Sequence, residues 1–171
     1  MKHSVILVGM PGAGKSTLGV MLAKNLAKEF VDTDLLIQTR AGKCLQTLLD
    51  DEGYLALRQL EEEVLIDCDF SNHVVATGGS AVYSAAGMVS LRTSGLVVFL
   101  DVPLAELRRR IHDYDTRGIA RRPGQSFESL FSERKSLYLH FSDLVVNCDG
   151  KTQEQLLQEL TQLITGEDTI E

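Results

Sequence analysis

The chain has 171 residues, a length typical of one domain, and 44% of them are hydrophobic, which is enough for a sizeable core. Its formal net charge of -7 argues against a general affinity for nucleic acid or acidic membranes, although a local site can still bind phosphate. No apolar run is long enough to cross a bilayer. We therefore expect one domain over residues 1–171, with no nucleic-acid or membrane partner.

Two features bear on the compartment in which the protein works. The cysteines, Cys44, Cys68 and Cys148, are widely spaced and fit neither a disulfide framework nor a zinc site. Residues 1–3 lead directly into an apolar segment, without the pattern of a signal peptide. Free thiols and no leader predict a cytoplasmic protein, and nothing in the sequence demands more than a monomer.

Residues 9–17 read Gly-Met-Pro-Gly-Ala-Gly-Lys-Ser-Thr and fit the pattern of a phosphate-binding P-loop. An apolar segment over residues 4–8 precedes the motif, and a helical pattern follows it. Glycines let the backbone aim N–H groups at an anion, and the helix N-terminus adds its own. Lys15 then reaches the outer phosphates, and the Ser16 hydroxyl holds Mg²⁺. We expect the phosphate cradle to comprise Gly12, Ala13, Gly14, Lys15, Ser16 and Thr17.

Beyond this loop, short apolar segments alternate with amphipathic helical patterns, which predicts an α/β fold with a parallel sheet covered on both faces. After the first strand at 4–8, the expected strands are residues 30–32, 73–77, 96–100 and 144–147. After the P-loop helix, the expected helices are residues 35–42, 45–51, 54–67, 84–91, 103–111, 126–138 and 152–164, followed by a frayed tail over 166–171. In such sheets ligands bind beyond the carboxyl ends of the strands.

Two carboxylates, Asp32 and Asp34, follow the second expected strand. Their position suits a residue that supports Mg²⁺ and one that accepts a substrate hydroxyl, and alternation along an extended segment would send both side chains the same way. Asp34 could also cap a helix beginning at Leu35. Gly78 and Gly79 end the third strand, so we expect them to meet the carboxylates and the P-loop at one edge of the sheet.

Arginines offer a second, weaker signal. Arg58 and Arg134 are surface residues by default, but together at a P-loop they would favour an anionic substrate, because guanidinium groups bind carboxylates in a bidentate fork. Residues 112–125 lack hydrophobic periodicity, which predicts a mobile loop rather than a core element. This loop is either a solvated basic segment or a lid that closes over phosphates, and its arginines are Arg117, Arg121 and Arg122.

In these motifs the chain resembles the shikimate kinase family, within the nucleoside-monophosphate-kinase-like group of P-loop proteins. The similarity spans about residues 4–148. Besides the P-loop, it lies in residues 32–34, 52–61, 74–79, 97–103 and 133–138. The P-loop alone is unspecific, whereas Asp-x-Asp, the glutamate-to-arginine segment and the Gly-Gly strand end in this order are much more specific.

The resemblance implies a P-loop kinase with five strands in the order 2-3-1-4-5, a helical substrate-binding insert over about residues 35–65 and a lid over about residues 112–125. It also implies transfer of the γ-phosphate of ATP, with Mg²⁺, to a hydroxyl of shikimate in aromatic amino acid biosynthesis. On this reading Asp34 contacts the substrate hydroxyls and acts as base or orienter. Arg58 and Arg134 hold the substrate carboxylate, while Gly78 and Gly79 let the backbone approach the ring.

For the nucleotide, the resemblance implies that Asp32 supports Mg²⁺ together with Ser16 and that Arg110 lies against the adenine. Arg117 is the best match to the lid arginine of the family, although Arg122 competes for that position. The implied catalytic set is Lys15, Asp34 and Arg117.

The chain departs from the family pattern at three places. Ser80 stands where a third glycine is expected, Leu57 stands where phenylalanine is usual, and residues 117–125 lack the lid motif Arg-Pro-Leu-Leu. These changes leave the catalytic set intact and bear on the acceptor, so another small hydroxy acid such as gluconate or homoserine is the alternative to shikimate. A regulatory protein that only binds nucleotide is a different class, and Asp34 with the arginines counts against it.

Overall fold

The computed structural model describes residues 4–166, so residues 1–3 and most of the expected tail lie outside the described part. Five parallel strands form one sheet in the order β2-β3-β1-β4-β5, as predicted. The strands are β1 Ser4–Val8, β2 Glu29–Asp32, β3 His73–Ala76, β4 Gly95–Asp101 and β5 Leu144–Asn147. β1 is central, with Val5 opposite Val74 on one side and Leu96 on the other.

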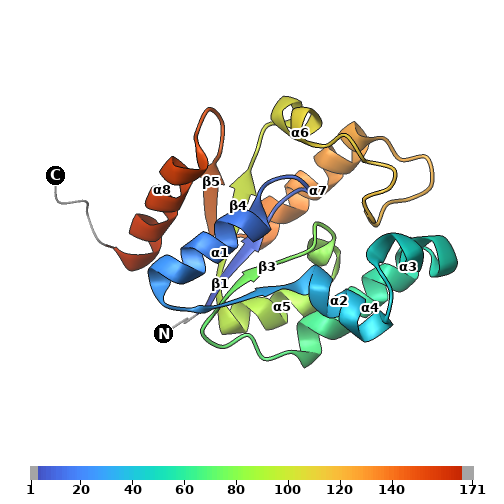
Figure 1. Ribbon diagram of the computed structural model, residues 1–171, viewed down its shortest axis with the longest axis horizontal. Coiled ribbons are helices and arrows are strands. Elements are labelled where there is room, and N and C mark those ends of the chain that lie inside the picture. Colours follow the sequence, from blue (N-terminus) through green and yellow to red (C-terminus); the bar gives the residue numbers. More distant parts are fainter. Residues whose placement is uncertain (1–3, 167–171) are drawn as a thin grey trace.

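Helices cover both faces of this sheet, which explains why β1 is a continuous, fully buried apolar run. α1 (Lys15–Leu26) packs against α8 (Gln153–Thr165) on one face (Figure 1). Right-handed crossovers place α5 (Ala85–Ser94) and α7 (Phe127–Phe141) against the opposite face, where both contact β4. No helix among residues 4–166 is long and apolar enough to cross a bilayer.

Three helices connect β2 to β3, over the region predicted as the insert: α2 Thr33–Ala41, α3 Leu45–Glu52 and α4 Tyr54–Asp67. They enclose a second, small core around Ile37, Leu48 and Val64. α2 begins at Thr33, earlier than the expected Leu35, because the Asp32 side chain accepts a hydrogen bond of 2.9 Å from the backbone N–H of Asp34. Asp32, rather than Asp34, is therefore the helix cap.

The segment expected as a mobile loop follows α6 (Leu104–Arg110) and precedes α7. It has no regular structure, but it is not excluded from the core. Ile119 belongs to the main core and Ala120 to the small core of the insert, and both are buried. The backbone N–H of Gly118 donates to Oε1 of Gln46 on α3 at 2.9 Å, so the loop lies against α3 (Figure 1). Two adjacent apolar residues produce no periodicity that a sequence could reveal.

Helix ends elsewhere follow their capping residues. Ser126 caps α7, and Thr152 with Gln155 forms the predicted capping box of α8. A short 3₁₀ turn, η1 (Ala81–Tyr83), was not predicted, and it lies between the Gly78-Gly79 strand end and α5. This turn brings two side chains, Ser80 and Tyr83, to the helical insert.

Candidate active site

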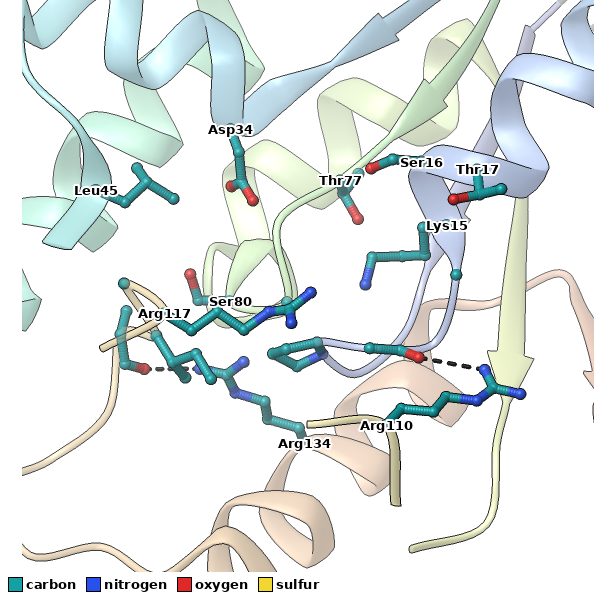
Figure 2. A pocket seen from close by; sticks show the side chains of 17 residues that line it. Lys15, Ser16, Thr17, Asp34, Leu45, Thr77, Ser80, Arg110, Arg117 and Arg134 are labelled. Carbon is teal, nitrogen blue, oxygen red and sulfur yellow. Dashed lines mark hydrogen bonds between the residues drawn. The ribbon is translucent and has the colours of Figure 1, made fainter. Parts of the chain in front are cut away.

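A cavity of about 360 Å³ opens at the carboxyl edge of the sheet, between the P-loop, the insert and the loop after α6 (Figure 2). Most predicted site residues line it: Gly12, Gly14, Lys15, Ser16, Thr17, Asp34, Gly79, Arg110, Arg117 and Arg134. The other four, Ala13, Asp32, Arg58 and Gly78, do not line the cavity but lie next to residues that do.

The P-loop presents backbone rather than side chains to the cavity. Gly14 is the residue before α1 and has a left-handed backbone, with φ of 90°. It provides no side-chain cap, and the first turn of α1 holds no acidic residue. The positive end of this helix is therefore available to an external anion. Ala13 is buried and faces the core.

Lys15 is buried beside this loop, and its ammonium group donates to the carbonyl oxygens of Gly9 at 2.7 Å and Met10 at 2.8 Å. Burial lowers the pKa of Lys15 to about 8, opposed by the negative charge of Asp34. Arg110 also contacts this loop, because it donates to the carbonyl oxygen of Gly12 at 3.2 Å.

The Ser16 hydroxyl donates to one carboxylate oxygen of Asp32, whose other oxygen caps α2. A hydroxyl and a carboxylate beside a phosphate site are the oxygen donors that Mg²⁺ prefers, and this ion needs few protein ligands when phosphates supply the rest. The pair therefore fits Mg²⁺.

Asp34 points into the cavity from the first turn of α2 (Figure 2). Burial, followed by the charge of Asp32, raises the pKa of Asp34 to about 6. Gly78 lies directly beneath it: a Cβ built there would stand 2.6 Å from Oδ1 of Asp34 and 2.5 Å from Oε1 of Glu61. A side chain at this position would displace the carboxylate groups of Asp34 and Glu61, so glycine preserves their placement.

Glu61 is a site residue to which the sequence analysis assigned no role. Its side chain is 2% exposed, the Ser80 hydroxyl donates to Oε2, and Oε1 has no hydrogen-bond partner among the residues that the structure describes. Burial raises the pKa of Glu61 to about 7. The available signal was its register, since Glu61 shares the apolar side of α4 with Leu57 and Val64.

Arg134 is 1% exposed, so the default of a surface arginine is wrong for this residue. Its Nη2 donates to the carbonyl oxygen of Ala120 at 2.7 Å, while its Nε is buried without a partner within residues 4–166. Arg58 packs over the Tyr83 ring, with Cζ 3.6 Å from the ring centroid, and its Nε and Nη2 are also buried without partners in this part of the chain. Buried donors without partners are rare in proteins, so these two cations indicate an anion site.

The arginines of the loop have different environments. Arg117 lines the cavity and extends toward Lys15 in Figure 2. Arg122 points elsewhere and forms an ion pair of 2.8 Å with Glu133. Arg121 pairs with Asp115 and lies over a tyrosine ring. Of the two candidates for the lid arginine, only Arg117 faces the cavity.

Comparison with known proteins matches this architecture to one family. A family model described as shikimate kinase matches residues 11–165. The shikimate kinases of Paracidovorax citrulli and Hahella chejuensis are 36% and 32% identical, covering 92% and 99% of this chain and 89% and 91% of theirs.

Solved structures agree. A shikimate kinase from Acinetobacter baumannii, in complex with shikimate, has a TM-score of 0.84 and 29% identity, covering 95% of this chain and 93% of its own. The shikimate kinase of Aquifex aeolicus has a TM-score of 0.80 and 30% identity, covering 95% and 96%. A thymidylate kinase from Candida albicans, with a TM-score of 0.59 and 14% identity, shares the fold. With a family match over nearly its full length, this chain belongs to the shikimate kinase family.

Proposed function

We propose that this protein transfers the γ-phosphate of ATP to a hydroxyl group of shikimate. The observation that carries the proposal is one cavity with Lys15 and Asp34 on opposite sides and the Arg134 guanidinium at its acceptor end (Figure 2). The A. baumannii relative, whose structure contains shikimate, supports this acceptor. Shikimate carries a carboxylate and ring hydroxyls, which correspond to the two kinds of group at that end.

Shikimate kinases use ATP, generally with Mg²⁺, and we assign the nucleotide to the P-loop side of the cavity. The backbone of residues 12–17 binds the phosphates, and Lys15 leaves the Gly9 and Met10 carbonyls to neutralise the developing charge. We assign Arg110, which donates to the Gly12 carbonyl oxygen, to the adenine. Ser16 and Asp32 hold Mg²⁺, which supplies further charge neutralisation at the phosphates.

At the acceptor side, Asp34 accepts the proton of the attacking hydroxyl or orients that hydroxyl for in-line attack. A pKa raised to about 6 keeps the group ionised at neutral pH and still basic enough to take a proton. Arg134 and Arg58 bind the carboxylate, because both have buried donors without partners. Gly78 and Gly79 let the ring approach the strand end.

Arg117 closes the cavity from the loop, so we assign it, rather than Arg122, to the transferring phosphate. The Gly118–Gln46 contact holds this loop against the insert, which excludes water that would otherwise hydrolyse ATP. We further propose that the enzyme is a monomer and cytoplasmic, which the free thiols of Cys44, Cys68 and Cys148 support.

An acceptor panel tests the proposal. ADP release is measured with Mg·ATP and shikimate, gluconate or homoserine, and shikimate is expected to give the highest kcat/KM. Asp34→Asn is isosteric and should lower kcat by about 10²–10⁴, the usual contribution of a general base. Asp67→Asn, an exposed aspartate at the end of α4, is the matched control. A preference for gluconate or homoserine would refute shikimate, and tight ATP binding with no acceptor turned over would favour a nucleotide-binding protein.

A further inference from the structure

Tyr83, the last residue of η1, lies between the carboxylate site and the loop. The Arg58 guanidinium stacks on its ring at 3.6 Å, and the Arg134 guanidinium lies 5.4 Å from the same centroid. Cations over an aromatic face are attracted by its quadrupole. The plane of this ring therefore determines where the Arg58 guanidinium lies.

No hydrogen bond competes with the ring for the buried donors of Arg58. Its Nε and Nη2 have no partners among the described residues, and neither does Oε1 of Glu61, one turn further along α4. Residues three apart on a helix commonly form ion pairs, but here Glu61 accepts from Ser80 instead. Arg58 is thus held by aromatic contacts, chiefly with Tyr83, since the Tyr54 ring on its own helix lies further away, at 5.1 Å from Cζ.

The position of Tyr83 depends in turn on Glu133 of α7. The Tyr83 hydroxyl donates to Oε1 of Glu133 at 2.5 Å. The second oxygen, Oε2, accepts from Nη2 of Arg122 at 2.8 Å and from Nε2 of Gln125 at 3.3 Å. Both donors belong to the loop over residues 112–125. These hydrogen bonds, Tyr83 first, hold the pKa of Glu133 below its usual range, so the carboxylate is ionised.

We propose that Glu133 and Tyr83 are positioning residues that couple closure of this loop to the orientation of Arg58. In the closed loop, Arg122 and Gln125 fix Glu133, Glu133 fixes the Tyr83 ring, and the ring holds Arg58 ready for a carboxylate. Opening the loop removes two donors from Glu133 and loosens the whole chain of contacts. Because such coupling is reciprocal, a bound carboxylate favours the closed loop. The inference rests on the proposed function, in which Arg58 binds the acceptor carboxylate.

We call the path from Arg122 through Glu133 and Tyr83 to Arg58 the relay. Three single variants test it: Tyr83→Phe, Glu133→Gln and Arg122→Gln. The first keeps the ring and removes only the hydroxyl. Each should raise KM for shikimate about threefold to tenfold, the range expected for the loss of one hydrogen bond of ordinary net strength. KM for ATP should stay within about twofold, since residues 12–17 are untouched, whereas a fall in kcat is compatible with the relay because Arg117 lies in the same loop. Arg122→Lys should restore part of the loss. Arg92→Gln, which breaks an exposed ion pair with Asp143, is the matched control.

Non-additivity separates a relay from independent damage. The double variant Tyr83→Phe/Arg122→Gln should raise KM for shikimate no more than the larger single change, because both break the same path. Additive effects, or an unchanged KM in Tyr83→Phe, would overturn the relay.

A second readout needs no acceptor. In the ligand-free protein, Tyr83→Phe and Glu133→Gln should speed backbone hydrogen exchange over residues 117–125, while Arg92→Gln should not. Wild-type protein that fails to phosphorylate shikimate would refute the proposed function, and exchange in these variants would still decide the relay. Unchanged exchange in Tyr83→Phe would overturn it.

Discussion

The two sides of the cavity are built in different ways. On the nucleotide side, the phosphate loop is one continuous segment, residues 9–17, whose lysine donates to carbonyl groups of the same loop. The acceptor side draws on α2, α4, the end of β3 and α7, and among the described residues it leaves polar atoms of Arg58, Glu61 and Arg134 buried without hydrogen-bond partners. The lysine of one side is satisfied within its own loop, whereas the other side keeps buried polar atoms available to a ligand.

This difference separates general from specific recognition. A loop of backbone N–H groups binds the phosphates of any nucleotide, and it does so at little expense to the empty protein. Buried charges without partners destabilise the empty protein, by about 1–3 kcal/mol for each group. The acceptor side therefore gives up folding stability for selectivity, which makes the two sides experimentally distinguishable.

After Asp34→Asn, the largest effect is expected at the nucleotide side. Lys15→Met should lower kcat/KM by about 10²–10³, as for other losses of a group that stabilises transition-state charge. The thermal midpoint should not fall, because the variant removes a buried cation whose pKa burial already lowers to about 8. Lys24→Met, an exposed change on the same helix, is the control for both measurements. A large fall in the midpoint would show that this side is not complete without its lysine.

The pH profile of kcat/KM should show the titration of one residue from each side of the cavity. Below about pH 6 the rate should fall close to tenfold per unit, because Asp34 takes up a proton; above about pH 8 it should fall again, because Lys15 loses one. Asp34→Asn should abolish the acidic limb of its residual activity and leave the basic limb. A profile flat from pH 5 to 9 would contradict both assignments.

Protonation of Asp34 should have opposite effects on activity and on stability: it lowers the rate but favours the folded protein. Asp34 binds its proton more tightly in the folded protein, with a pKa of about 6, than at its ordinary value of 3.8. The unfolded chain therefore releases the proton first, and the free energy of unfolding falls as pH rises from about 4 through 6. Denaturant titrations at these two pH values check the direction, with Asp34→Asn as the reference in which this contribution is absent.

The smallest effect concerns Ser80, the position that departs from the family pattern. Ser80→Ala removes the donor to Glu61 and should lower the free energy of unfolding at pH 7.5 by about 1–3 kcal/mol. Alanine suits the backbone there, with φ of -93°, so the loss reports the hydroxyl. Ser132→Ala, at an exposed site on α7, is the control. Equal stability of the two variants would mean that the hydrogen bond from Ser80 to Glu61 does not contribute to the free energy of unfolding.

The fold was largely predictable because its signals are local. The helix over Tyr54–Asp67 and the capping box at Thr152 came directly from periodicity and spacing. Where the prediction was wrong, the determinant was a contact rather than a pattern. α2 begins at Thr33 because of a single side-chain hydrogen bond from Asp32, and Ile119 enters the core although nothing around it repeats.

The site residues also fall into those that a local motif identifies and those that only long-range contacts bring together. The residues of the P-loop are contiguous, so one motif was enough to find them. Tyr83 and Glu133 lie 50 positions apart and meet only after the sheet and α7 are assembled. Tyr83 lies outside every motif, and Glu133 falls within the family-like segment 133–138 without a predicted role, so neither residue points to its partner. Long-range polar pairs of this kind are what a single sequence conceals.

The fit of the loop against the insert depends on the absence of a side chain at Gly118. Gly118 has a left-handed backbone, with φ of 73°, and a Cβ there would stand 2.7 Å from Cβ of Leu45 on α3. Any larger residue acts as a wedge that holds the loop off the insert. We therefore expect Gly118, which bears no functional group, to control how well the closed loop excludes water from the cavity. The ratio of phosphoryl transfer to wasteful ATP hydrolysis should depend on this position.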